Sequence, residues 1–154
     1  NNIDVFYQDT DSMHMYDDQV KKLEDAFRVK YGRELTGKNL GQFHCDFEPA
    51  HGYHNAVSKR FIGLGKKCYI DELESTNKNT GDKTISYHIR MKGVSTNAIL
   101  YKAKELNCTP YDIYKKLYDG EKLQFDLSVD NKVRFQKKQG SFFRGESLKR
   151  TISF

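Results

Sequence analysis

The amino end of the chain alternates between apolar and polar stretches in a way that predicts a β-hairpin followed by an amphipathic helix. Residues 5–7 are β-branched or aromatic and favour extended backbone, and residues 9–12 have the composition of a tight turn. From Asp17 to Tyr31 apolar side chains recur every three or four positions, as on one face of a helix. Gly32 is placed to end that helix.

The middle of the chain has the period of strands. We expect a short strand at 42–47 and a longer one from Arg60 to Glu74. The polar residues 76–82 predict a turn, after which a strand at 84–91 returns. This order predicts an antiparallel hairpin.

The last third of the chain begins with helical patterns. A helix is predicted at 96–106, and Thr109-Pro110 has the sequence of an N-cap followed by the first helical residue of a helix that ends at Gly120. Further strands are predicted at 122–129, 133–137 and 148–154. Together the elements predict an α+β fold with an antiparallel sheet.

Composition narrows the class of protein. The 154 residues suffice for one domain or two small ones, and ten Tyr and ten Phe predict a core rich in aromatic rings. Lys and Arg number 26 against 21 Asp and Glu, an excess that suits a polyanionic partner without requiring one. Three cysteines without paired spacing favour a reducing, intracellular compartment. No apolar run approaches the roughly 20 residues that cross a bilayer, so we expect no membrane association.

The acidic turn is the strongest chemical signal. Asp9 and Asp11 are separated by one residue, so both carboxylates leave the same face if the backbone stays extended there. Carboxylate oxygens are preferred ligands of Mg²⁺. Enzymes of phosphoryl and nucleotidyl transfer use two such ions about 3.5–4 Å apart. The turn therefore predicts a site for divalent cations.

The sequence Tyr7-Gln8-Asp9-Thr10-Asp11-Ser12, between two predicted strands, resembles motif C of family B DNA polymerases. His14, two residues after the serine, resembles the protein-primed branch of bacteriophages, adenoviruses and linear plasmids. Reverse transcriptases and RNA-templated polymerases place two adjacent aspartates here, whereas Thr10 separates them in this chain.

The resemblance implies a role for each residue of the motif. Asp11 matches the aspartate that bridges both metal ions, and Asp9 matches its less direct acidic partner. Tyr7 matches the tyrosine packed beside the incoming nucleotide or the base of the hairpin, and Thr10 and Ser12 lie near the nucleotide.

A second segment, Lys67-Cys68-Tyr69, resembles the Lys-x-Tyr motif of the same family. A strand would place Lys67 and Tyr69 on one face, where a cation and a phenol can hold the backbone of a primer end. Lys66 adds positive charge beside them.

A third segment, Met91-Lys92-Gly93-Val94, resembles the end of the family's palm domain. The resemblance thus assigns residues 1–94 to the palm and 95–154 to the thumb. Basic residues in the thumb are expected to hold the duplex backbone, which gives salt-dependent affinity without sequence information. The candidates are Lys132, Arg134, Lys137 and Lys138, and the expected thumb also carries Lys122, Arg144, Lys149 and Arg150.

The activity implied is that of a DNA-directed DNA polymerase with a primer–template, a deoxynucleoside triphosphate and two Mg²⁺ ions. In the protein-primed branch the first acceptor is a hydroxyl of a terminal protein. The family's other metal-binding aspartate and its fingers lysine are not found in this sequence, which also opens without Met. We therefore expect a piece of a longer chain that, taken alone, neither polymerises nor binds two metals tightly.

Two other readings compete with the polymerase. One is a non-catalytic basic DNA-binding module or scaffold in which the acidic turn is incidental. The other is a zinc site in the segment that contains His44, Cys45, His51 and His54. Zinc is disfavoured because His44 and Cys45 are adjacent and no Cys-x-x-Cys pair occurs.

Overall fold

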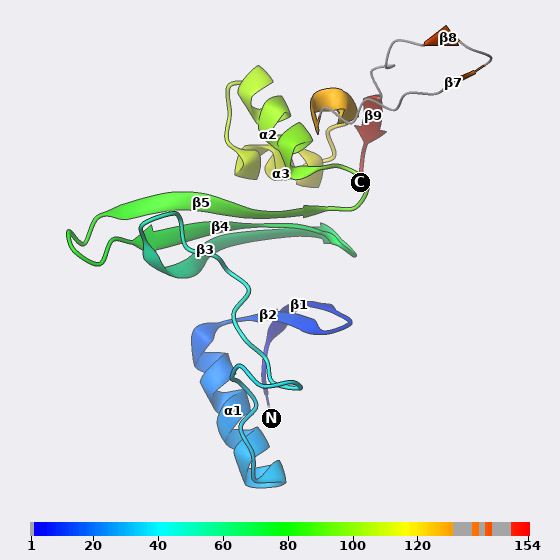
Figure 1. Ribbon diagram of the computed structural model, residues 1–154. Helices are drawn as coiled ribbons and strands as arrows, with labels where there is room; N and C mark the ends of the chain where they lie inside the picture. The colour runs from blue at the N-terminus through cyan, green and yellow to red at the C-terminus, as the bar shows by residue number, and fades with distance from the viewer. Residues whose placement is uncertain (1, 131–136, 139–140, 143–148) are drawn as a thin grey trace. The chain divides into compact units, whose positions relative to one another are not determined.

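The computed structural model describes residues 2–130, 137–138, 141–142 and 149–154 (Figure 1). The chain forms two compact units, Asn1–Phe47 and Glu48–Phe154, called the N-terminal and C-terminal units. Three α-helices and four antiparallel sheets occur within the described residues, so the predicted α+β class is confirmed.

The N-terminal unit contains the predicted hairpin and helix. Strands β1 (Val5–Asp9) and β2 (Ser12–Met15) pair antiparallel, and helix α1 (Asp17–Tyr31) follows. Gly32 ends α1 in the left-handed region at φ 65°, and its N–H donates to the carbonyl of Arg28 at 2.8 Å. The helix bounds agree with the prediction because both ends carry local signals.

The strand predicted at 42–47 is wrong. Within the described residues only an isolated bridge between Thr36 and Phe43 forms there. The N–H of Phe43 donates to the carbonyl of Leu35, and the Gln42 side chain accepts from the N–H of Asn39. These bonds close a compact loop, so the N–H groups of Asn39 and Phe43 are satisfied locally and not in a ladder.

The C-terminal unit is built on a three-stranded antiparallel sheet in the order β3–β4–β5. The strands are β3 (His54–Gly65), β4 (Cys68–Thr76) and β5 (Lys83–Met91). The single strand predicted from Arg60 to Glu74 is wrong because the chain reverses at Lys66-Lys67, where Lys67 has a φ of 58°. The predicted hairpin around residues 76–82 is confirmed by the β4–β5 pairing.

Two helices cover one face of this sheet, as Figure 1 shows. They are α2 (Thr96–Glu105) and α3 (Pro110–Tyr118). The Ser95 hydroxyl caps α2, and Thr109 and Asp112 form the capping box of α3. The shared core consists of Cys68, Ile70, Ile89, Met91, Val94, Ala98, Ile99, Ala103, Ile113, Tyr114, Leu117, Leu123 and Phe125.

The core runs across position 94, where the palm–thumb boundary is expected. The boundary between the two compact units instead follows Phe47, within the expected palm. The functional division at 94/95 stays a prediction.

After α3 the chain forms short elements. They are β6 (Leu123–Asp126), η1 (Leu127–Asp130), β7 (Lys137–Lys138), β8 (Ser141–Phe142) and β9 (Lys149–Ile152). The strand predicted at 122–129 therefore ends early. The Asp126 carboxylate accepts from the N–H of Ser128 at 2.9 Å, which bends the chain into η1. The last predicted strand is confirmed, and β9 pairs with β6. Most of the return strand expected at 133–137 lies outside the described residues.

The buried side chain of Ile70 gives a first test of this packing. Replacing Ile70, which is fully buried in β4, by Ala should lower the free energy of unfolding by about 2–5 kcal/mol through lost burial and a cavity. Ile85→Ala on neighbouring β5, where the side chain is 48% exposed, should cost about 0.5 kcal/mol or less. Urea denaturation followed by circular dichroism measures both, and equal losses would contradict the assignment of the core.

The capping box predicts a dependence of stability on pH. The N–H and hydroxyl of Thr109 donate to the Asp112 carboxylate at 3.0 and 2.9 Å, and these bonds hold the pKa of Asp112 below its ordinary 3.8. The stabilisation is therefore fully present above pH 3.8 and is lost as the pH falls through the lower pKa of the folded state.

Asp112→Asn should thus be less stable than the wild type at pH 7, by roughly 0.5–1 kcal/mol, with the difference closing in acid. Asp119→Asn, at the other end of α3, is the control. Denaturation midpoints between pH 2 and 7 decide, and a difference that stays constant through this range would refute the linkage.

Candidate functional site

The predicted site residues fall in both units, and each group is described by itself. In the N-terminal unit the acidic hairpin, defined as residues 5–15, holds the motif C residues. Asp9 is the last residue of β1 and lies opposite Ser12, so Thr10 and Asp11 form a two-residue turn. The backbone is not extended through residues 9–11. Strand alternation therefore does not place the carboxylates of Asp9 and Asp11 on one face. The distance between them depends on the conformation of the turn.

The two carboxylates differ in their surroundings. Asp9 is half-buried, and its Oδ1 accepts from the N–H of Thr10 at 2.9 Å and from the Thr10 hydroxyl at 3.3 Å. Asp11 is exposed, and among the described residues its carboxylate accepts no hydrogen bond and joins no ion pair. Asp9 is thus oriented by the turn, and Asp11 is open to a ligand.

Aromatic packing supports the base of the hairpin. Tyr7 and His14 are cross-strand partners, and their rings meet edge to face with centroids 5.6 Å apart. The ring of Phe47 also contacts His14, with the two ring centroids 6.0 Å apart. His14, the residue that suggested the protein-primed branch, therefore has a packing role in this hairpin.

The chemistry of the acidic hairpin fits a hard cation. Asp9 and Asp11 supply carboxylate oxygens, and no Lys or Arg of the described residues neutralises Asp11. No group of three or more His, Cys, Asp or Glu placed to hold a metal ion occurs in the described part of the chain. A complete two-metal cage therefore needs at least one ligand beyond these two aspartates.

In the C-terminal unit the Lys-x-Tyr segment is not a continuous strand. Lys66 and Lys67 form the β3–β4 turn, where both are exposed, and Tyr69 is the second residue of β4. The expectation that Lys67 and Tyr69 share a strand face is therefore wrong. Cys68 between them points into the core, where burial raises the pKa of its thiol to about 11 and keeps it protonated.

Tyr69 lies on the sheet face opposite the helices and is only 9% exposed. Its ring lies 5.9 Å from those of Phe61 and His88, and its hydroxyl oxygen is 3.5 Å from Nε2 of His88. Next along β4 on the same face, Asp71 accepts a hydrogen bond from the Ser58 hydroxyl at 2.7 Å. Tyr69 is thus held in a polar row that the sequence did not indicate.

Most of the predicted thumb contacts cannot be placed. Lys132 and Arg134 lie outside the described residues, and only the backbone of Lys137 and Lys138, in β7, is described. Their roles stay predictions.

The sheet brings one further basic segment to Lys67. The N–H of Lys92 donates to the carbonyl of Lys67 at 3.1 Å, which places the Met91–Val94 segment beside the Lys-x-Tyr turn. Arg150 reaches the same place from β9. The pairing of β4 with β5 brings Lys92 beside Lys67, and no local sequence pattern predicts this contact.

No protein family, curated protein or solved structure matches the chain. In the described residues no helix has the length and apolar character needed to span a membrane. The site is therefore interpreted from its own residues and from the motif resemblance.

The left-handed conformation of Lys67 gives a test of the turn on which the site depends. A β-branched residue is strained at φ 58°, so Lys67→Val should lower the free energy of unfolding by about 1–2 kcal/mol. Lys67→Gly should be tolerated at this position. Lys66→Val, one residue earlier in the turn, is the matched control. Urea denaturation of the three variants measures the effect, and a Lys67→Gly variant less stable than Lys67→Val would contradict this turn.

Proposed function

We propose that this chain contributes the motif C hairpin and primer-binding elements to a family B DNA polymerase. The supporting observation is the two-residue turn between β1 and β2, which joins an oriented Asp9 to an exposed Asp11. The segment from Tyr7 to Ser12, which includes this turn, resembles motif C of that family.

The proposed reaction is nucleotidyl transfer. The primer 3′ oxygen bonds to the α-phosphorus of the nucleotide, the bond from that phosphorus to the pyrophosphate oxygen breaks, and the hydroxyl proton is released. Bound Mg²⁺ would activate the hydroxyl and offset charge on the pyrophosphate. Asp11 and Asp9 would hold the ions, and Thr10 fixes the orientation of Asp9 through its N–H and hydroxyl.

The C-terminal unit would contact the primer strand. The exposed Lys66 and Lys67 supply positive charge at the β3–β4 turn, and Tyr69 is restrained by His88 and Phe61. A restrained phenol loses little conformational entropy on binding, which suits a residue that positions a primer end. Protein priming rests on the resemblance at His14, and under it the first acceptor is a hydroxyl of a terminal protein.

The second candidate function is a DNA-binding module without catalysis. The exposed lysines at the β3–β4 turn favour it, because backbone binding needs cations and no carboxylates. The two functions differ in whether the Asp11 carboxylate matters.

Asp11→Asn, introduced into the polymerase to which this chain is proposed to contribute, separates them. Loss of one carboxylate ligand removes several kcal/mol of charge stabilisation, so primer extension should fall by about a thousandfold. Affinity for the primer–template should stay within about threefold of the wild type, because an aspartate lost from the site removes no contact to phosphate.

Asp18→Asn, in the first turn of α1, makes the same change of charge outside the motif and should leave extension unchanged. Extension retained by Asp11→Asn would overturn the catalytic proposal. Extension lost equally in both variants would show that the motif has no special role.

A further inference from the structure

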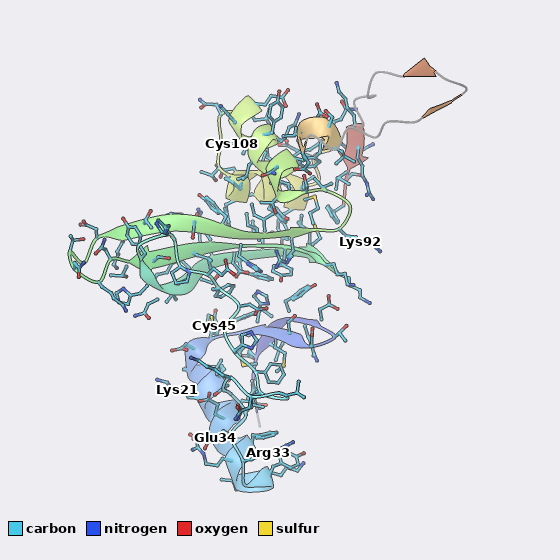
Figure 2. The ribbon with its side chains drawn as sticks, in the orientation of Figure 1. Lys21, Arg33, Glu34, Cys45, Lys92 and Cys108 are labelled. Carbon is cyan, nitrogen blue, oxygen red and sulfur yellow. The ribbon has the colours of Figure 1, made fainter. Side chains whose placement is uncertain are left out.

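One end of the β3–β4–β5 sheet gathers positive side chains from three separate parts of the sequence. Gly65 pairs with Cys68, and Cys68 pairs with Met91, so the β3–β4 turn and the exit from β5 lie side by side. Figure 2 shows Lys92 at this end of β5 with its side chain projecting from the ribbon. Lys66, Lys92 and Arg150 are called the basic corner.

Gly93 explains how Arg150 reaches this corner. Gly93 has a φ of 80°, and a Cβ added there would lie 1.8 Å from Nη1 and 2.9 Å from Cζ of Arg150. The guanidinium group therefore lies directly against the glycine backbone. A side chain at position 93 would occupy the space that the guanidinium group takes.

The backbone of Arg150 is held by the pairing of β9 with β6. Arg150 pairs with Phe125 across the β6–β9 ladder, and the Phe125 side chain is fully buried in the core. The contact with Gly93 therefore joins the C-terminal strand to the β5–α2 connection. Arg150 thus extends to the basic corner from β9, which is paired with β6.

Among the described residues, no acidic side chain pairs with the charges of the basic corner. Elsewhere on the sheet, Lys59 and Lys83 both pair with Glu74. Within the described part of the chain, no carboxylate forms an ion pair with any of the three residues of the basic corner. Exposed cations grouped at one end of a sheet, without carboxylate partners among the described residues, favour the binding of an anion.

The chemistry of the corner favours a nucleic-acid backbone over a lipid surface. A guanidinium group offers a planar fork of donors that matches the oxygens of a phosphate. Protein surfaces that bind membranes combine positive charge with exposed apolar side chains that enter the bilayer. None of the exposed large apolar side chains of the described residues lies in the β3–β4 turn, at positions 92–93 or in β9, and Phe154, which is 56% exposed, follows β9.

We propose that the basic corner binds the phosphodiester backbone of DNA, and that Gly93 is needed to seat Arg150 in it. The choice of DNA rests on the proposed function. The site itself lies within the C-terminal unit and uses none of the carboxylates of the acidic hairpin.

Removal of single charges tests the site. Arg150→Met and Lys92→Met keep the length of the side chains and remove the charge, and each should weaken binding of a fluorescein-labelled primer–template duplex about tenfold. Each should also lower the slope of log Kd against log salt by about one, because one phosphate contact is lost. Fluorescence anisotropy of this chain over a salt series measures both quantities.

Lys78→Met is the matched control, because Lys78 is exposed in the β4–β5 turn at the other end of the sheet. It makes the same change in net charge and should alter affinity less than twofold. Effects of Arg150→Met and Lys92→Met no larger than that of Lys78→Met would overturn the proposal.

Gly93→Ala tests the seating of Arg150. If the added Cβ displaces the guanidinium group, Gly93→Ala should weaken duplex binding as much as Arg150→Met, and the double variant should be no weaker than either single one. Gly81→Ala controls for backbone strain, because Gly81 has a φ of 75° and no neighbouring atom within 4 Å of an added Cβ. Wild-type affinity in Gly93→Ala, or independent effects that multiply, would refute this role.

The outcomes also separate this inference from the polymerase proposal. Loss of binding in Arg150→Met together with full extension in Asp11→Asn would keep the basic corner and remove the catalytic role. The reverse result would keep the catalytic role alone. Arg150-dependent binding to phosphatidylserine vesicles without binding to the duplex would overturn the inference in favour of a lipid surface.

Discussion

Strand β4 has buried side chains on both of its faces, and its register sets the positions of the strands and turns that pair with it. Ile70 points into the core with α2 and α3, whereas Asp71 and Leu73 are 1% and 2% exposed. Because alternate residues point to opposite faces, a slip of one residue would exchange Ile70 with Asp71. That exchange would place a carboxylate in an apolar core, at a cost of several kcal/mol. The register is therefore strongly specified, and with it the pairing that brings the Lys67 carbonyl to the N–H of Lys92.

The strand pairing of the sheet also decides which arginine side chains meet a carboxylate. Arg60 on β3 forms two hydrogen bonds with Glu72 of β4, and its guanidinium carbon lies 3.9 Å from the centre of the Tyr111 ring. It thus ties two strands to α3, and the bonds to Glu72 raise its pKa. Arg150 has the same chemistry but meets a glycine backbone and no carboxylate among the described residues. Net charge cannot distinguish these roles, since the difference lies in whether the fold supplies a counter-charge.

The sequence predicted those elements whose ends are marked by neighbouring residues. The bounds of α1 and the start of α3 were predicted because Gly32, Thr109 and Pro110 mark helix ends locally. The β3–β4 turn was missed because Lys67, a residue with no turn preference, occupies the left-handed region. For the candidate site, the acidic hairpin is a local feature and was placed correctly.

The basic corner was not predicted as a unit, although Lys66 had been singled out for the primer terminus and Arg150 for the thumb. It depends on β4–β5 pairing and on the return of β9 to β6. These are contacts between residues far apart in the sequence, so neither periodicity nor turn composition reports them.

The acidic hairpin shows the opposite case. It is easily predicted from the sequence, yet in the described residues it forms only a two-stranded sheet. Its helix α1 has no fully buried residue, and Val5 and Phe6 are exposed. A two-stranded hairpin is marginally stable without a further strand or a packed layer. In the proposed polymerase, the strand with the remaining metal-binding aspartate would supply that neighbour, so the same strand would complete both the sheet and the metal site. In that proposed polymerase the stability of the hairpin and its metal chemistry would be linked through one strand.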